Sequence, residues 1–267
     1  MANSLTFPVV AVDVGNSRIK LGDFEHPLAE PLPHPNRALA IELDWAAGSF
    51  DGWLPHDPAE YAWSIASVNR PAATRLVDWL QARHVPRIHL LTHADLPLSV
   101  DVPRADRVGL DRLSNAVAAN RLRNENRGAI VIDIGSAITL DWIAENGSFA
   151  GGAILPGLGM SARALHEFTD LLPLVEVTER PEPLGTSTMT AISSGLFWGA
   201  VGAMREVMAR LAVGPTETQV FLTGGGAPLF AVALGEVSPG PLEFVPHLTL
   251  AGIALTALGT AAEKESW

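Results

Sequence analysis

The sequence predicts an α/β protein built from two similar halves. Two observations lead to this prediction: an apolar strand pattern that occurs twice, and an alternation of candidate strands and helices along the chain. The first copy reads VVAVDVGN at residues 9–16, and the second reads IVIDIGSA at residues 130–137. Each copy is a β-branched run that ends in Asp-x-Gly and is followed by a further apolar segment. We therefore expect a strand, a tight turn and a second strand in each half.

The remaining elements follow from periodicity and from the positions of Pro and Gly. Residues 26–58 are rich in Pro and His and are expected to form a loop. Other strands are expected at 62–68, 87–91 and 219–222, and helices at 72–84, 111–123, 161–172, 189–211 and 248–262. Residues 124–128 are polar, so we expect an N-terminal domain of residues 1–125 and a C-terminal domain of residues 126–267.

Composition limits the possible functions. The chain has 267 residues, of which 48% are hydrophobic, so it can bury one large core or two ordinary ones. Its net charge of −11 is spread along the chain, which argues against a nucleic-acid-binding surface. The absence of cysteine excludes disulfides, thiolate nucleophiles and thiolate zinc sites. Neither a secretory pattern nor an apolar stretch of the roughly 20 residues that a membrane span needs is visible, so we expect a cytoplasmic protein.

The two Asp-x-Gly turns are the first candidate functional features. Asp13 and Asp133 each end an apolar strand, and Mg²⁺ prefers carboxylate oxygens in proteins. The glycine that follows allows backbone N–H groups to approach a phosphate without a Cβ in the way. A strand ending in Asp-x-Gly can also be no more than a good hairpin, but its repetition favours a nucleotide site.

Two further segments have both a functional and a structural interpretation. Gly224-Gly225-Gly226 follows a candidate strand and permits close approach of a ligand, although such a run is more often only a flexible turn. Asp111 stands at the start of a candidate helix, where an acid is commonly a cap. With Arg112 beside it, Asp111 also suits a kinase: one group accepts a hydroxyl proton and the other holds a carboxylate. The eight histidines show no metal-binding spacing and are assigned to surfaces and loops.

Five ordered motifs resemble those of type III pantothenate kinases and span nearly the whole chain. They are DVGNSRIK at 13–20, GLDR at 109–112, DIGSAITLD at 133–141, GGAILPG at 151–157, and Thr188 with Ala191 and Gly195. The resemblance implies the actin-like, sugar-kinase-like fold, with two ribonuclease-H-like domains and ATP between them. It implies a homodimer with pantothenate near the subunit interface, and phosphorylation of pantothenate to 4′-phosphopantothenate, the first committed intermediate toward coenzyme A.

The resemblance also implies roles for individual residues. It makes Asp111 the general base, assigns Mg²⁺ to Asp13 through ATP, and assigns a monovalent cation, K⁺ or NH₄⁺, to Asp133. The implied ATP contacts are Asp13, Val14, Gly15, Asn16, Ser17, Arg18, Ile19, Lys20 and Ser136. The implied pantothenate contacts are Gly109, Leu110, Asp111, Arg112 and Thr188.

The sequence departs from the family pattern in two places. Ser17 and Ser136 stand where the family usually has Thr, and both keep the hydroxyl group. An aromatic residue that commonly precedes the G-x-D-R motif is absent, because residues 100–108 contain none. Two other functions therefore stay open: a kinase of another small hydroxy acid, and a nucleotide-binding regulatory protein without turnover.

Overall fold

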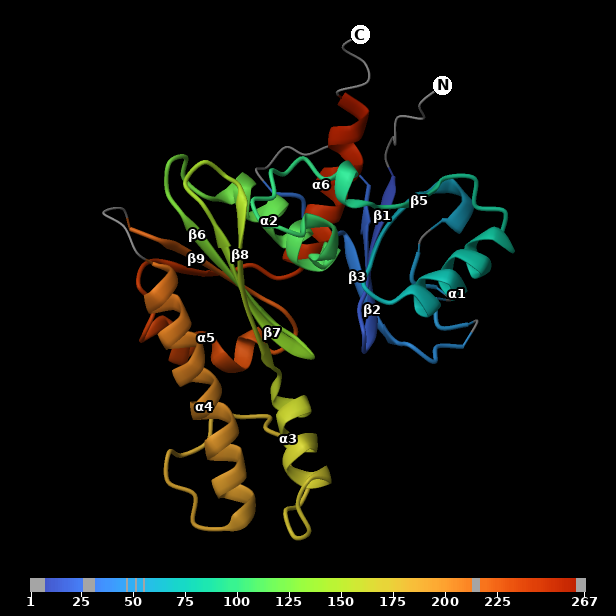
Figure 1. Cartoon of the computed structure of the whole chain (residues 1–267). Helices are drawn as coiled ribbons and strands as arrows, with labels where there is room; N and C mark the ends of the chain where they lie inside the picture. Colours follow the sequence, from blue (N-terminus) through green and yellow to red (C-terminus); the bar gives the residue numbers. More distant parts are fainter. Residues whose placement is uncertain are drawn as a thin grey trace. The chain divides into compact units, whose positions relative to one another are not determined.

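The computed structural model forms two compact units. It describes residues 8–25, 32–46, 48–50, 52–54, 56–212 and 217–262. Unit 1 comprises Met1–Leu122 together with His247–Trp267, and unit 2 comprises Arg123–Pro246. Each unit has its own sheet and its own helices (Figure 1). No helix in the described part of the chain is long and apolar enough to cross a membrane.

Unit 1 is built on a five-stranded mixed sheet in the order β3-β2-β1-β4-β5. Strand β1 pairs antiparallel with β2 and parallel with β4, and the two outer strands continue these senses. The strands are β1 (Val9–Val14), β2 (Arg18–Phe24), β3 (Arg37–Glu42), β4 (Ala62–Ser67) and β5 (Ile88–Leu90). Its helices are α1 (Arg70–Gln81), α2 (Leu110–Leu122) and α6 (Leu248–Ala262), with 3-10 turns η1 (Pro58–Glu60), η2 (His93–Asp95) and η3 (Ala105–Arg107).

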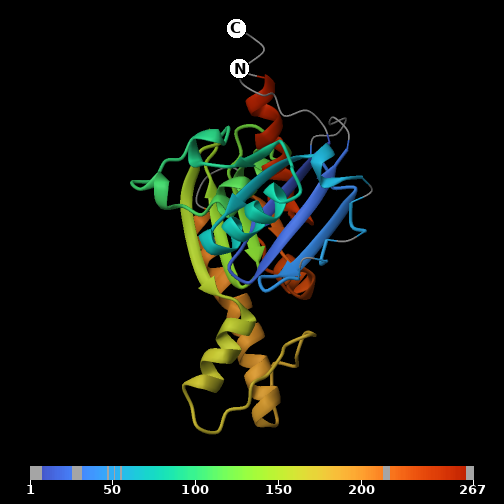
Figure 2. The same ribbon diagram turned by 90° about the vertical axis from the view of Figure 1, so that its right-hand side faces the viewer.

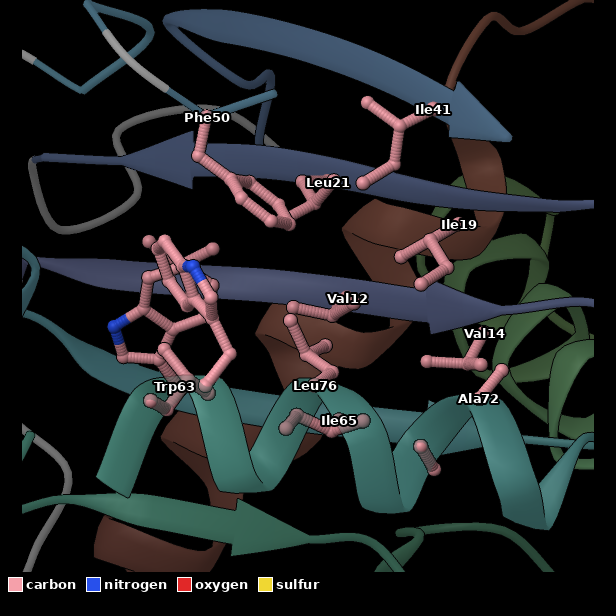
Figure 3. Close-up of a cluster of buried hydrophobic side chains, with 14 of the residues drawn as sticks. Val12, Val14, Ile19, Leu21, Ile41, Phe50, Trp63, Ile65, Ala72 and Leu76 are labelled. Atoms are coloured by element: carbon pink, nitrogen blue, oxygen red, sulfur yellow. The ribbon is translucent and has the colours of Figure 1, made fainter. Parts of the chain in front are cut away.

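Helix α1 covers one face of this sheet. The Asn69 side chain accepts a hydrogen bond from Ala72 N and so caps the helix, and Pro71 occupies its first turn. Leu76 and Leu80 then fall on one side of the helix and pack on the β-branched residues of β1 and β4. Figure 3 shows this core, with the aromatic side chains gathered at one end.

Helix α6 covers the opposite face of the same sheet and packs on β1, β4 and α2. Because successive strand residues point to opposite faces, Val10, Val12 and Val14 meet α1, while Val9 contacts Ala257 of α6. Asp13 shares the α6 side of β1 with Val9. Because of this alternation, the Asp13 carboxylate lies on the opposite face of the sheet from the core that packs on α1.

Unit 2 repeats the topology of unit 1. Its sheet runs β10-β9-β6-β7-β8, and β6 pairs antiparallel with β7 and parallel with β9, as β1 does with β2 and β4. The strands are β6 (Ala129–Ile134), β7 (Ala137–Ile143), β8 (Phe149–Pro156), β9 (Gln219–Thr223) and β10 (Leu242–Phe244). The helices are α3 (Leu158–Glu167), α4 (Thr188–Leu211) and α5 (Ala227–Gly235). The α/β class and the duplicated strand-turn-strand pattern are thus confirmed.

Several expected elements differ in the structure. The closing helix, assigned from sequence to the second half, groups with unit 1 because it packs on β1 and α2. Strand β3 forms inside the segment expected to be a loop, and β8, β10 and α5 were not expected as elements. The helix expected at 161–172 begins at Leu158 and ends at Glu167.

Candidate active site

The first Asp-x-Gly turn closes the β1–β2 hairpin over three residues. Gly15 N donates to Arg18 O at 3.0 Å, and Asn16, Ser17 and Arg18 are exposed. A Cβ on Gly15 would lie 3.1 Å from Arg18 O, which explains why glycine occupies this tight position. The turn therefore presents short polar side chains and backbone to solvent.

Two residue pairs flank this turn, one apolar and buried, the other charged. Val14 and Ile19 face each other across the hairpin and are buried, so they can offer a ligand only their backbone. Asp13 faces Lys20 in the same register, and Lys20 Nζ lies 3.7 Å from Asp13 Oδ2. The Asp13 side chain is 7% exposed and that of Lys20 is 35% exposed, so the carboxylate is buried while the Lys20 side chain remains accessible to solvent.

Arg18 has a protein partner in this structure. Its Nε donates to Glu42 Oε1 at 2.9 Å across β2 and β3, and both side chains are more than half exposed. An exposed pair of this kind contributes roughly 0–1 kcal/mol, so exchange of Glu42 for a phosphate costs little.

The second turn, between β6 and β7, is one residue shorter than the first. Gly135 N donates to Ala137 O at 2.9 Å, and the two turn residues, Gly135 and Ser136, are exposed. Asp133 ends up half-buried beside them. The duplication seen in sequence therefore holds for the strands but not for the length of the turn.

Two glycine segments surround the second turn within unit 2. Gly157 N donates to Ser136 O at 3.1 Å, and a Cβ on Gly157 would lie 2.5 Å from that oxygen. Gly224 has φ of +95°, and a Cβ there would meet Asp133 Oδ1 and Ile134 O. Protein backbone thus approaches these glycines closely, an arrangement that side chains would prevent.

A cavity of about 580 Å³ opens beside the second turn, between α3 and α5. Gly135 and Gly226 lie at one part of its wall, and Leu229 and Phe230 supply apolar surface. Arg163 of α3 and residues 174–177, which follow it in the chain, complete the wall, with Glu176 as its acidic member. Cavities of roughly 300–1,000 Å³ are typical of small-molecule sites.

Asp111 lies in the first turn of α2, as its sequence predicted. Its Oδ1 accepts a hydrogen bond from Arg112 N at 2.8 Å, and both residues are half-buried, whereas Leu110 is buried. A Cβ on Gly109 would meet that same Asp111 oxygen, so only glycine at 109 leaves room for this carboxylate position. This explains the G-x-D spacing physically.

Val68 connects the first turn with the start of α2. Val68 N donates to Val14 O at 3.1 Å, and Val68 Cγ1 would lie 3.4 Å from a Cβ at Gly109. Val14, Val68 and Gly109 all belong to unit 1. Val68 therefore lies next to both the turn that follows Asp13 and the start of the helix that carries Asp111.

Thr188 occupies a different place from the second turn within unit 2. It is the exposed first residue of α4, after Ser187, whose Oγ accepts from Thr190 N. Thr188 lines a groove of about 1420 Å³ between α3 and α4, together with Pro156, Met160 and Phe168. Gly135 does not line this groove; it lines the separate 580 Å³ cavity.

One neighbour of Lys20 was not predicted from sequence. His247, just before α6, has φ of +59°, and burial together with the charges of Lys20 and His34 lowers the pKa of its imidazole. No motif signalled it, because Lys20 lies in β2 and His247 just before α6, far apart in the sequence. Within the described ranges, no group of three or more His, Asp or Glu side chains is arranged to hold a metal ion.

Comparison with known proteins identifies the family. A sequence model of type III pantothenate kinases matches residues 9–210. A type III pantothenate kinase of Dehalococcoides mccartyi (strain ATCC BAA-2266 / KCTC 15142 / 195) is 32% identical over 231 residues, which cover 84% of this chain and 88% of that one. The enzyme of that name from Roseobacter denitrificans is 40% identical over 136 residues, about half of each chain.

Solved structures show the fold. An activator of 2-hydroxyisocaproyl-CoA dehydratase from Clostridium difficile, with bound ADPNP, superposes with a TM-score of 0.53, 15% identity and 97% coverage of both chains. Component A of (R)-2-hydroxyglutaryl-CoA dehydratase from Acidaminococcus fermentans gives a TM-score of 0.53, 19% identity, and coverage of 96% of this chain and 100% of that one. Both have the actin-like ATPase fold, and this agrees with the two related sheets. With its fold, its paired Asp-x-Gly turns and its G-x-D-R helix start, the chain belongs to the type III pantothenate kinase family.

Proposed function

We propose that this chain transfers the γ-phosphoryl group of ATP to the primary hydroxyl group of pantothenate and so supplies 4′-phosphopantothenate for coenzyme A synthesis. The observation that carries the proposal is the meeting at Val68 of the turn after Asp13 and the helix start at Asp111. A phosphate-binding turn and a carboxylate that can accept a proton are the two parts that an alcohol kinase needs near each other. Family membership supports pantothenate as the acceptor and the cytoplasm as the place of the reaction.

The first turn is the proposed site for the ATP phosphates. Its exposed Asn16 and Ser17 offer an amide and a hydroxyl group, and Lys20 adds a positive charge that already faces solvent. Arg18 joins this set by leaving Glu42. The buried Val14 and Ile19 contribute through their backbone alone.

The 580 Å³ cavity is the proposed site for the nucleoside part of ATP. It begins at Gly135, beside Ser136, so a nucleotide that contacts the Ser136 hydroxyl can place its base between α3 and α5. Leu229 and Phe230 give the apolar surface that a flat base requires, and Arg163 and Glu176 give polar partners for its edge.

Asp111 is the proposed general base. Arg112 N holds one carboxylate oxygen, Oδ1, and the second oxygen is the one we assign to the substrate hydroxyl. As the hydroxyl oxygen attacks the γ-phosphorus, its proton passes to Asp111, and the bond from phosphorus to the ADP oxygen breaks. The Arg112 guanidinium is the proposed partner of the pantothenate carboxylate, and Thr188 a proposed contact of its amide or hydroxyl groups.

The residues present fit the cations that such a reaction uses. Mg²⁺ usually binds through one or two carboxylates plus substrate phosphates, and Asp13 supplies one carboxylate beside the phosphate turn. When bound, Mg²⁺ neutralises charge on the phosphoryl oxygens. Asp133, half-buried beside the second turn, is the proposed ligand of K⁺ or NH₄⁺.

We also propose a homodimer formed through an apolar arm, which consists of α3, residues 168–187 and the first turn of α4. Figures 1 and 2 show α3 and α4 side by side, extending beyond the sheet of unit 2. Phe168 and Leu171 are each 85% exposed, and Leu184 and Met189 are also exposed. Large apolar side chains gathered in this way mark an association surface, and Thr188 in the same groove would bring the acceptor pocket to it.

The proposal is tested by Asp111→Asn with a matched control, Asp101→Asn, which changes an exposed acid shortly before the motif. Asn retains the size of Asp and its ability to accept Arg112 N, but it cannot take up the proton. We expect kcat for ADP release to fall on the order of 10²–10⁴-fold in Asp111→Asn, with unchanged ATP affinity by calorimetry, and Asp101→Asn to match the parent.

The same assay separates the rival functions. Turnover with other hydroxy acids but not with pantothenate would indicate a different kinase. ATP binding without turnover on any acceptor would indicate a regulatory protein. A stable Asp111→Asn variant with parental kcat would return Asp111 to a structural role.

A further inference from the structure

His93 contacts the chain immediately before the G-x-D-R motif. It opens the short turn η2, and its Nε2 lies 2.8 Å from the backbone oxygen of Val108. A carbonyl oxygen only accepts, so His93 donates through Nε2–H. Val108 is followed directly by Gly109, and Asp111 lies three residues after Val108. No sequence motif includes this histidine.

Val108 is the junction between η3 and α2. Its N–H donates to Ala105 O at 3.2 Å and so ends η3, while Leu113 N donates to Gly109 O at 3.2 Å and so starts the ladder of α2. The oxygen of Val108 therefore stands one position ahead of the helical ladder. In an α-helix that began one residue earlier, this oxygen would accept from Arg112 N, four residues on.

That helical bond is replaced by two others. Arg112 N donates to Asp111 Oδ1 at 2.8 Å, and the Val108 oxygen accepts from His93. The imidazole thus satisfies the acceptor that would compete with Asp111 for Arg112 N. The position of the Asp111 carboxylate depends on Arg112 N staying available to it.

The turn that carries His93 is itself well fixed. Asp95 Oδ2 accepts from both Thr92 N and Thr92 Oγ1 at 2.7 Å, and Asp95 Oδ1 lies 3.7 Å from His89 Nε2. The bond from Thr92 N is one half of a capping box at η2, in which the Thr92 side chain accepts from the Asp95 backbone in return. His93 is therefore presented by a preorganised turn rather than by a free loop.

We infer that His93 is a positioning residue for Asp111: by holding the Val108 oxygen, it leaves Arg112 N to orient the carboxylate toward the acceptor hydroxyl. This rests on the proposed role of Asp111 as general base. When the imidazole donor is lost, Arg112 N turns to Val108, α2 gains one helical bond, and the carboxylate loses the partner that fixes it.

The test compares two substitutions of similar length, His93→Gln and His93→Met. The Gln side chain keeps an N–H donor and the Met side chain has none. His93 is half-buried on the outer turn, so neither change reaches the core. We expect kcat to fall on the order of 10–10²-fold in His93→Met, with unchanged KM for ATP, and to be largely retained in His93→Gln. Asp101→Asn, an exposed position between η2 and η3, should match the parent.

A double-mutant cycle with Asp111→Asn shows whether His93 acts through Asp111. If it does, His93→Met causes no further loss of kcat once Asp111 is Asn. Equal kcat in His93→Met and His93→Gln, or a further full loss in the Asp111→Asn background, would overturn the inference. The proposed function fails separately, by parental kcat in Asp111→Asn alone. Melting temperatures of all variants serve as the folding control.

Discussion

The crossing of α2 and α6 gives the sharpest stability prediction, for Gly252→Ala. Thr249 Oγ1 donates to Asn115 Oδ1 at 2.9 Å in this crossing, and Gly252 lies directly against the backbone of α2. A Cβ on Gly252 would lie 2.6 Å from the carbonyl carbon of Ser114 and closer still to its oxygen. Ordinary contact begins near 3.4 Å, and backbone atoms cannot rotate aside, so the two helices must separate by roughly 1 Å.

The magnitude follows from two opposed effects. Forcing a methyl group into a packed interface costs about 1–3 kcal/mol. Replacing a helical glycine by alanine returns about 0.5–1 kcal/mol. Because the clash is with backbone atoms, its cost lies in the upper part of that range, about 2–3 kcal/mol. The net loss is then about 1–2.5 kcal/mol, which lowers the melting temperature of a chain of this size by about 2–10 °C. Because Asp111 lies in the first turn of α2, displacement of this helix should also lower kcat, on the order of 10-fold.

The assay is a thermal melt together with steady-state kinetics, with Gly202→Ala as the matched control. Gly202 lies within α4, and a Cβ there meets nothing within 4 Å, so this variant should gain about 0.5–1 kcal/mol. A Gly252→Ala protein that melts at or above the parental temperature, with parental kcat, would refute the close crossing.

Three further predictions concern pH, cations and assembly. Burial raises the pKa of Asp23 above 3.8, outweighing Arg37, which lowers it. The folded state therefore loses stability as pH rises from 3.8 through the raised pKa of Asp23, because its carboxyl group must ionise while buried. We expect Asp23→Asn to raise the melting temperature at pH 7. Thermal melts at different pH values should show this gain vanish below about pH 3.8. A gain independent of pH would contradict this. Replacing K⁺ by tetramethylammonium at constant ionic strength should abolish turnover, whereas an unchanged rate would remove the cation role from Asp133. Light scattering should find a dimer, and Phe168→Asp with Leu171→Asp should yield a monomer; a parent that is already monomeric and fully active would exclude the arm as an interface.

The sequence predicted best where local pattern and burial agree. The runs around Asp13 and Asp133 are buried central strands, so their apolar character shows their structure directly. Strand β3 could not be found in this way, because it is an edge strand in which only Ile41 is buried. Its pairing with β2 determines its structure, and no local signal reports that pairing.

Contacts between distant segments account for the rest. Asp111 was placed correctly at a helix start, but its bond to Arg112 N depends on the position of Val108, which His93 holds from fifteen residues away. Gly157 and Gly224 belong to sequence motifs, but the sequence does not show why glycine is needed there. In the structure, the end of β6 and the turn after it approach both positions too closely for a side chain. Such reasons appear only when both partners are placed.

The grouping of α6 with unit 1 has a consequence for synthesis. Val9, Ala62 and the α2 backbone at Ser114 all find their partners on α6, near the end of the chain. A nascent chain that has emerged as far as Pro246 already contains all of unit 2, whereas unit 1 still lacks the helix that covers one face of its sheet. The strands of unit 1, which leave the ribosome before unit 2, thus complete their packing after it, and until then their uncovered apolar face is a target for chaperones.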